Sequence, residues 1–183
     1  MKRSIITTIL LLALIGQALA APVSVSVVDS KGAKGDTVKV PINVAGATNL
    51  GAMGIVLNYD PSVLKGMGAD AGALASNALV ESNELNPGTM RISFADSKGI
   101  SGDGAILDAS FEVVGDTGAS TQISLEATGY DINLLDVQIK TSPGTFNVEE
   151  KGLPVLSIII AAIIVLLILV FVVRKISKSK KEA

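Results

Sequence analysis

Apolar and polar residues alternate strictly in many short runs of this sequence. Val alternates with Ser in the run 23–27, and Val or Ile alternates with Lys, Pro and Asn in the run 38–44. Successive side chains of a β-strand point to opposite faces, so a period of two predicts strands with one buried face. Six further runs share the period, at 52–59, 90–94, 107–113, 123–125, 137–139 and 146–148. This pattern constrains the chain to an all-β fold.

Turn-forming residues separate the runs. Gly, Pro, Asp, Asn and Ser gather at 32–36, 86–88, 97–104, 115–118 and 142–144, and we interpret each cluster as a turn. Residues 69–79 are predicted to hold a helical turn or a loop. Eight or nine short strands without an amphipathic helix predict an antiparallel β-sandwich.

The first 20 residues are typical of a secretory signal peptide. A basic start at Lys2 and Arg3 precedes a short apolar run, and small residues at Ala18 and Ala20 provide the expected cleavage site. We therefore predict export of the chain, with cleavage after Ala20.

A second apolar segment begins at Val155 and ends at Val173. It contains one Ser and no charged residue, and its 19 residues are long enough for a transmembrane helix. The tail 174–183 carries five basic residues and one acid, which predicts a cytoplasmic tail. The expected topology is single-pass in the cell membrane: an extracellular module at 21–148, a short linker at 149–154, the span and the basic tail.

The predicted extracellular part is strongly acidic. Residues 21–154 carry 16 Asp and Glu against 8 Lys and Arg, which argues against binding to nucleic acid. The chain has no His and no Cys, so it lacks an imidazole base, a thiolate nucleophile and the usual ligands of zinc. We predict that the protein is not an enzyme.

Two stretches, 29–36 and 96–103, share the pattern Asp-Ser-Lys-Gly-x-x-Gly-Asp. Because Asp, Ser and Gly are common between strands, we interpret both stretches as turns. Calcium is the alternative, with oxygen ligands from Asp103, or from Asp131 together with Asn133 and Asp136. No cofactor is otherwise expected.

Carbohydrate binding is the main rival to protein binding for a module of this shape. Sugar rings usually stack on exposed Trp or Tyr. The chain has no Trp, and Tyr59 is predicted to point inward, so Tyr130 alone remains for a glycan site. A structural or self-associating envelope protein is a third hypothesis.

Four stretches, taken in order, resemble the cohesin domain. The first is 35–42, with Gly-Asp-Thr-Val-Lys-Val-Pro-Ile, and the second is 51–64, which ends in the turn Tyr-Asp-Pro-Ser-Val-Leu. The third is 86–104, which begins with Asn-Pro-Gly-Thr-Met-Arg-Ile-Ser-Phe-Ala-Asp-Ser and ends with Gly-Asp-Gly. The fourth is 144–148, with Gly-Thr-Phe-Asn-Val. The resemblance covers almost all of residues 23–148. It implies a jelly-roll sandwich of about nine strands that binds a dockerin module through one sheet face.

By position, the resemblance implies a partner-binding surface built from three strands. Its residues are Ala52, Gly54, Val56 and Asn58 from one strand, Arg91, Ser93, Asp96 and Gly99 from a second strand and its loop, and Ile106, Asp108 and Ser110 from a third. Cohesins of cellulosomes often carry polar Asn and Asp where this chain has Ala52 and Gly54. This flat strand therefore leaves open a partner other than a dockerin. We expect a secreted or surface protein as the partner.

Overall fold

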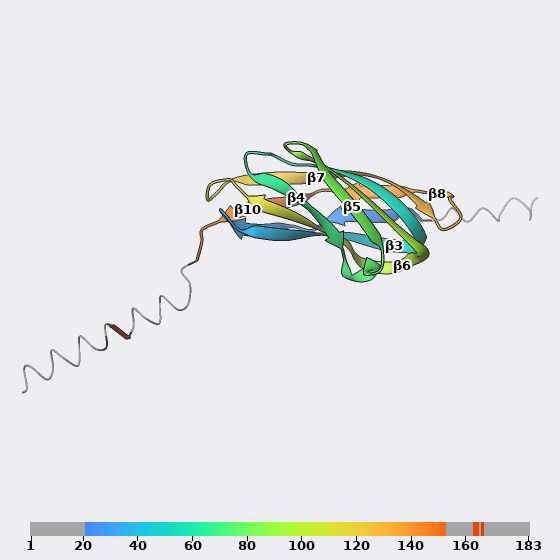
Figure 1. Cartoon of the computed structure of the whole chain (residues 1–183), viewed down its shortest axis with the longest axis horizontal. Helices are drawn as coiled ribbons and strands as arrows, with labels where there is room; N and C mark the ends of the chain where they lie inside the picture. Colours follow the sequence, from blue (N-terminus) through green and yellow to red (C-terminus); the bar gives the residue numbers. More distant parts are fainter. Residues whose placement is uncertain (1–20, 153–162, 165, 167–183) are drawn as a thin grey trace, which may run out of the picture. The chain divides into compact units, whose positions relative to one another are not determined.

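The computed structural model describes residues 21–152 together with Ile163, Ile164 and Leu166 (Figure 1). Ten strands and one 3₁₀ turn form the part 21–152, which is therefore all-β, as the alternation predicted. The elements are β1 Val23–Val27, β2 Ser30–Ala33, β3 Thr37–Asn58, β4 Leu64–Ala71, the 3₁₀ turn η2 Ala73–Ala75, β5 Leu79–Asn86, β6 Thr89–Val113, β7 Ser120–Asp131, β8 Asp136–Val137, β9 Ile139–Ser142 and β10 Gly144–Glu149.

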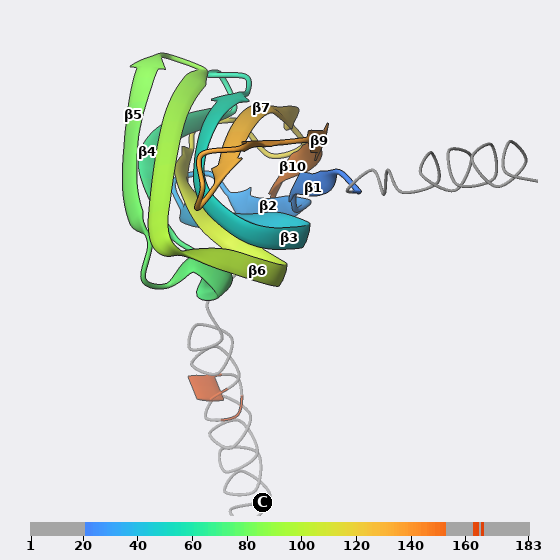
Figure 2. The same cartoon turned by 90° about the vertical axis from the view of Figure 1, so that its right-hand side faces the viewer.

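The strands form two layers, and the long strands β3 and β6 belong to both of them. In the first layer, the early part of β3 pairs with β1 and with the late part of β6, while β9 and β4 lie outside them. In the second layer, the late part of β3 lies between β7 and the early part of β6, and β5 pairs with β6. The four main strands of the second layer are therefore ordered β5-β6-β3-β7, while the short β8 pairs with the end of β7, and β10, which carries β2 on its other side, pairs with the start of β7. Figure 2 shows β3 and β6 curving side by side from one layer into the other.

The core lies between the two layers. The inward residues of β3 and β6 alternate with exposed ones and are almost completely buried. Tyr59, which is 7% exposed, sets its ring edge-on to Phe111 with 4.9 Å between the ring centroids. The two residues come from opposite layers, so this aromatic contact joins them.

The predicted turn at 97–104 is wrong, because β6 continues through it and remains paired with β3. Successive register shifts between Ile42 and Ala52 bend the paired strands here. Gly46 on β3 and Gly99, Gly102 and Gly104 on β6 have positive φ angles, which suit the bulges. The backbone N–H of Gly46 donates to Asp103 Oδ1 at 2.7 Å. Asp and Gly serve here to bend two strands rather than to reverse the chain.

Two strand pairs depart from the predicted antiparallel arrangement. β1 pairs with β9 in parallel, and β10 pairs with β2 in parallel. The partners lie more than 100 residues apart in the sequence, so no hairpin forces them to run in opposite directions.

The predicted turn or loop at 69–79 is correct only in part, since residues 69–71 belong to β4 and η2 follows them.

The described part beyond β10 is small. Contacts divide the chain at Glu149 into two units, and the buried core of the described residues lies entirely between Val23 and Val148. The predicted signal peptide at 1–20 and the basic tail lie outside the described residues. The predicted span at 155–173 also falls outside them, apart from Ile163, Ile164 and Leu166. Among the residues that the structure describes, no helix is long and apolar enough to cross a membrane.

Candidate functional site

The outer side of the second layer forms a face of four strands, which we call the outer face. Its residues lie in register across the sheet: Val56 pairs with Arg91 on one side and with Glu126 on the other, and Gly54 pairs with Ser93 and Thr128. The full set is Leu79, Glu81 and Asn83 on β5, Arg91, Ser93 and Ala95 on β6, Ala52, Gly54, Val56 and Asn58 on β3, and Ser124, Glu126, Thr128 and Tyr130 on β7.

Six of the predicted surface residues come together on this face. Ala52, Gly54, Val56 and Asn58 all lie on the outer side of β3, and Arg91 and Ser93 lie beside them on β6. The alternation of β3 explains the placement, because Met53, Ile55 and Leu57 fill the core between them.

Asp108 and Ser110 lie elsewhere. They occupy the late part of β6 in the first layer, where Asp108 pairs with Pro41 and Asp70 and Ser110 pairs with Lys39. The third stretch of the predicted surface therefore lies in the other layer, away from residues 52–58 of β3 and 91–93 of β6. The outer face instead uses β5 and β7 as its outer strands.

Ile106 is not a surface residue, since it is completely buried. The pairing of β3 with β6 shifts here, from Leu107 opposite Ile42 to Ala105 opposite Asn43, so Ile106 is an extra residue in β6. This bulge turns two consecutive side chains inward, which a strict period of two does not predict.

Asp96 and Gly99 lie near the end of the outer face, and each has a local structural role. Asp96 Oδ1 accepts the backbone N–H of Lys98 at 2.8 Å, so the carboxylate holds its own loop. A Cβ atom on Gly99 would lie 2.7 Å from Ile132 Cγ2 and 3.1 Å from the backbone of Asn49. Gly99 therefore leaves room for the loop after β7 to pack against β6.

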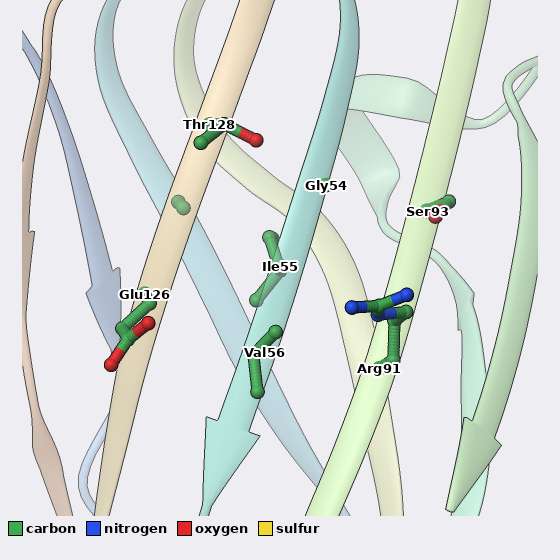
Figure 3. Close-up of a pocket in the computed structure, with 8 residues that line it drawn as sticks. Gly54, Ile55, Val56, Arg91, Ser93, Glu126 and Thr128 are labelled. Atoms are coloured by element: carbon green, nitrogen blue, oxygen red, sulfur yellow. The ribbon is translucent and has the colours of Figure 1, made fainter. Parts of the chain in front are cut away.

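The centre of the outer face is hollowed along β3. Figure 3 shows Arg91 on one side of Val56 and Glu126 on the other, with Ser93 and Thr128 farther along the same two strands. Residues 54–56 form the floor of this hollow, whose volume is about 490 Å³. One wall offers a guanidinium group and the other a carboxylate, so the hollow presents both charges to a bound molecule.

A second hollow of about 680 Å³ lies at the end of the face near Ala52 and Ala95. Leu79, with 78% of its surface exposed, and Leu134, with 81%, line it together with Ile132. The loop that carries Ile132 and Leu134 is tightly bonded: Asp131 Oδ1 accepts the backbone N–H groups of Asn133 and Leu135 at 2.8 and 2.9 Å. These bonds lower the pKa of Asp131 below its usual value.

Among the described residues, the charged side chains of the outer face are not in ion pairs, whereas several charged side chains elsewhere on the module are. Four ion pairs join described residues, and all four lie off this face: Lys31 with Glu149, Lys34 with Asp116, Lys39 with Asp70, and Lys65 with Glu112. The exposed charges of the face, on Arg91, Glu81 and Glu126, belong to none of these pairs. They are therefore available to charges on another molecule.

The polar and charged side chains of the outer face can form hydrogen bonds and ion pairs with another molecule.

In the part that the structure describes, no three His, Cys, Asp or Glu residues are grouped as metal ligands. Of the carboxylates considered for calcium, Asp103 and Asp131 already accept backbone N–H groups.

Comparison with known proteins decides the family of the module. The sequence pattern of the cohesin domain matches residues 23–148, which is more than half of the chain. The chain belongs to the cohesin family. No curated protein matches this cohesin in sequence.

Solved structures agree with this assignment. A non-cellulosomal cohesin from the archaeon Archaeoglobus fulgidus is 28% identical and superposes with a TM-score of 0.62, covering 70% of this chain and 91% of that one. The sixth cohesin of scaffoldin B from Acetivibrio cellulolyticus, in complex with a mutant Cel5 dockerin, is 23% identical with a TM-score of 0.64, covering 70% and 100%. The OlpC cohesin of Clostridium thermocellum, also in complex with a dockerin, is 19% identical with a TM-score of 0.61, covering 73% and 97%.

The sequence prediction missed the residues that β5 and β7 contribute to the face of this cohesin. Glu126, Thr128 and Tyr130 alternate with inward residues of β7, so the sequence does mark them as outward. The sequence contains no local signal that places β7 beside β3, because this pairing joins residues about 70 positions apart.

Proposed function

We propose that this cohesin is a protein-binding module that docks a secreted or surface partner through the outer face, with a dockerin-bearing protein as the first candidate. The unpaired charges of the outer face carry the proposal. Arg91 and Glu126 are exposed and take part in none of the ion pairs between described residues, and charged groups of this kind steer and fix a protein partner. Two of the similar cohesins are in complex with dockerins, which supports this choice of partner.

Calorimetry with purified proteins tests the docking. The module 21–152 is titrated with dockerin modules from the secreted proteins of the same organism. Wild-type module is expected to bind one of them, and Arg91→Glu to weaken that binding at least about tenfold, because reversing a charge in a complementary interface places like charges together. Asp96→Lys, at the edge of the face, is expected to have a smaller effect.

Lys140→Glu is the matched control, since it makes the same change of charge on β9, away from the outer face. It should bind like the wild type. If Arg91→Glu binds normally, the outer face is not the docking surface. If no dockerin binds, and a glycan array gives signals that Tyr130→Ala abolishes, carbohydrate binding replaces protein binding.

Location is a separate part of the proposal. The apolar segments at 1–20 and 155–173 support export and a single C-terminal anchor, with the module outside the cell. Protease added to intact cells should remove the module and spare the tail 174–183. Loss of the tail with protection of the module would reverse the topology.

A further inference from the structure

The outer face carries opposite charges at matched positions on the two sides of β3. Arg91 on β6 and Glu126 on β7 both lie in register with Val56. Neighbouring strands are about 4.8 Å apart, so the two residues stand at nearly equal distances from β3. Both are exposed, and neither takes part in an ion pair between described residues. Figure 3 shows this arrangement.

A second copy of the chain, turned by half a rotation about an axis along β3, fits this charge pattern. The rotation brings the second outer face down onto the first and exchanges the β6 side with the β7 side. Arg91 of each copy then lies opposite Glu126 of the other, and two identical ion pairs form. Such self-complementarity is what an interface with two-fold symmetry requires.

The shape of the face permits this contact. Along the axis, β3 presents Ala52, Gly54 and Val56, with Asn58 at its end, so the middle of the two strands can approach to the spacing of stacked sheets, about 10 Å. Gly54 has a negative or extended φ, and a Cβ atom there would meet only Thr128 Oγ1, at 3.5 Å. Neither the backbone conformation nor packing within the chain therefore requires a glycine at position 54.

Two exposed leucines supply a second, independent observation. Leu134 is 81% exposed and has a φ of +63°, a conformation that a leucine rarely adopts. Neither burial nor backbone preference explains a leucine at this position in a single copy. Leu79 stands on the opposite wall of the same hollow. The rotation that pairs the charges also brings Leu79 of each copy toward Leu134 of the other.

We propose that this cohesin forms a two-fold symmetric dimer through the outer face, with β3 along the axis. Rotation about this axis leaves the two copies of β10, where each module ends, at the same level along β3. Two copies anchored in one membrane meet at a high effective concentration, so a weak interface suffices. The dimer itself does not depend on the proposed docking function. If both hold, the dimer covers the docking face and competes with the partner.

Sedimentation equilibrium of the module 21–152, which contains the entire described core, tests the dimer without any partner. Wild-type module should pass from monomer to dimer as its concentration rises. Arg91→Glu and Glu126→Arg should each weaken the dimer at least about tenfold, because each places like charges opposite one another twice. An equimolar mixture of the two variants should dimerise again, since the new carboxylate of one faces the new guanidinium of the other.

Three further variants complete the test. Lys140→Glu makes the same charge change away from the face and should dimerise like the wild type. Leu134→Asn suits a positive φ and should weaken the dimer about tenfold without loss of thermal stability. Gly54→Gln should prevent close approach of the two β3 strands.

Two results would overturn the inference. One is a module that stays monomeric up to its solubility limit. The other is a pair of folded charge variants that dimerise normally alone or fail to dimerise when mixed. Either result leaves partner binding by the monomer untouched, so failure of the dimer is distinguishable from failure of the docking proposal.

Discussion

Glu84 on β5 joins the free edges of the two layers through a single carboxylate oxygen. Its Oε1 accepts the Tyr59 hydroxyl at 2.6 Å and the backbone N–H of Gly66 on β4 at 3.1 Å. Burial, followed by the bond to Glu84, raises the pKa of Tyr59, so its hydroxyl stays protonated and donates. The alternation predicted that Tyr59 points inward, but it could not identify Glu84, which lies 25 residues away on another strand.

Tyr59→Phe should destabilise the module by about 1–2 kcal/mol, because a half-buried carboxylate loses a donor. Urea unfolding at neutral pH measures the change. Tyr130→Phe is the matched control, since Tyr130 is 43% exposed and its hydroxyl has no hydrogen bond among the described residues. Equal stability of the two variants would contradict this role for Glu84.

The same contact predicts a pH dependence. The bond from Tyr59 lowers the pKa of Glu84 in the folded module. A lowered folded pKa contributes stability above the unfolded value, about 4.3, and this contribution is lost as the pH falls through the folded pKa. The stability difference between wild type and Tyr59→Phe should therefore be larger at pH 7 than at pH 3. Urea titrations at both values measure it, and a difference that grows on acidification would be inconsistent with an ionised Glu84.

At the scale of elements, sequence reasoning succeeded where side-chain alternation decides the structure. The runs at 23–27, 38–44 and 90–94 all lie within strands, with the predicted residues inward. It failed where glycines bend a paired strand, because positive φ angles serve turns and bulges alike. Gly99 shows the ambiguity: it belongs to a turn-like cluster, yet it lies within β6 and packs beneath Ile132.

Gly99→Ala should destabilise the module by about 2–3 kcal/mol. About 1 kcal/mol comes from a φ of +75°, and the remainder from the close contact of the new Cβ with Ile132 and Asn49. Gly118→Ala is the control, since its φ is +88° but nothing lies within 4 Å of the new Cβ. Chemical unfolding of both variants separates the backbone cost from the steric cost. A smaller loss of unfolding free energy for Gly99→Ala than for Gly118→Ala would show that the loop after β7 moves away from the new Cβ at no cost, and would contradict the steric role of Gly99.

At the scale of the whole molecule, the cohesin family was recognisable from four stretches of sequence, but only part of the outer face was predictable. The residues of β3 and the early part of β6 were correctly placed on one face. Asp108 and Ser110 were assigned to the same surface, yet they lie in the other layer. Both sets belong to β6, and only the bend of this long strand decides which part reaches which layer. That bend depends on bulges spread over two strands.

In the proposed function, the module docks its protein partner through the outer face. NMR spectra of the ¹⁵N-labelled module 21–152, recorded with and without a bound dockerin partner, test it most directly. Docking through the outer face predicts shifted or broadened amide signals from 52–58, 89–95 and 124–130, with little change in β1 and β4. Changes confined to β1, β4 and the late part of β6 would place the partner on the first layer and contradict docking through the outer face.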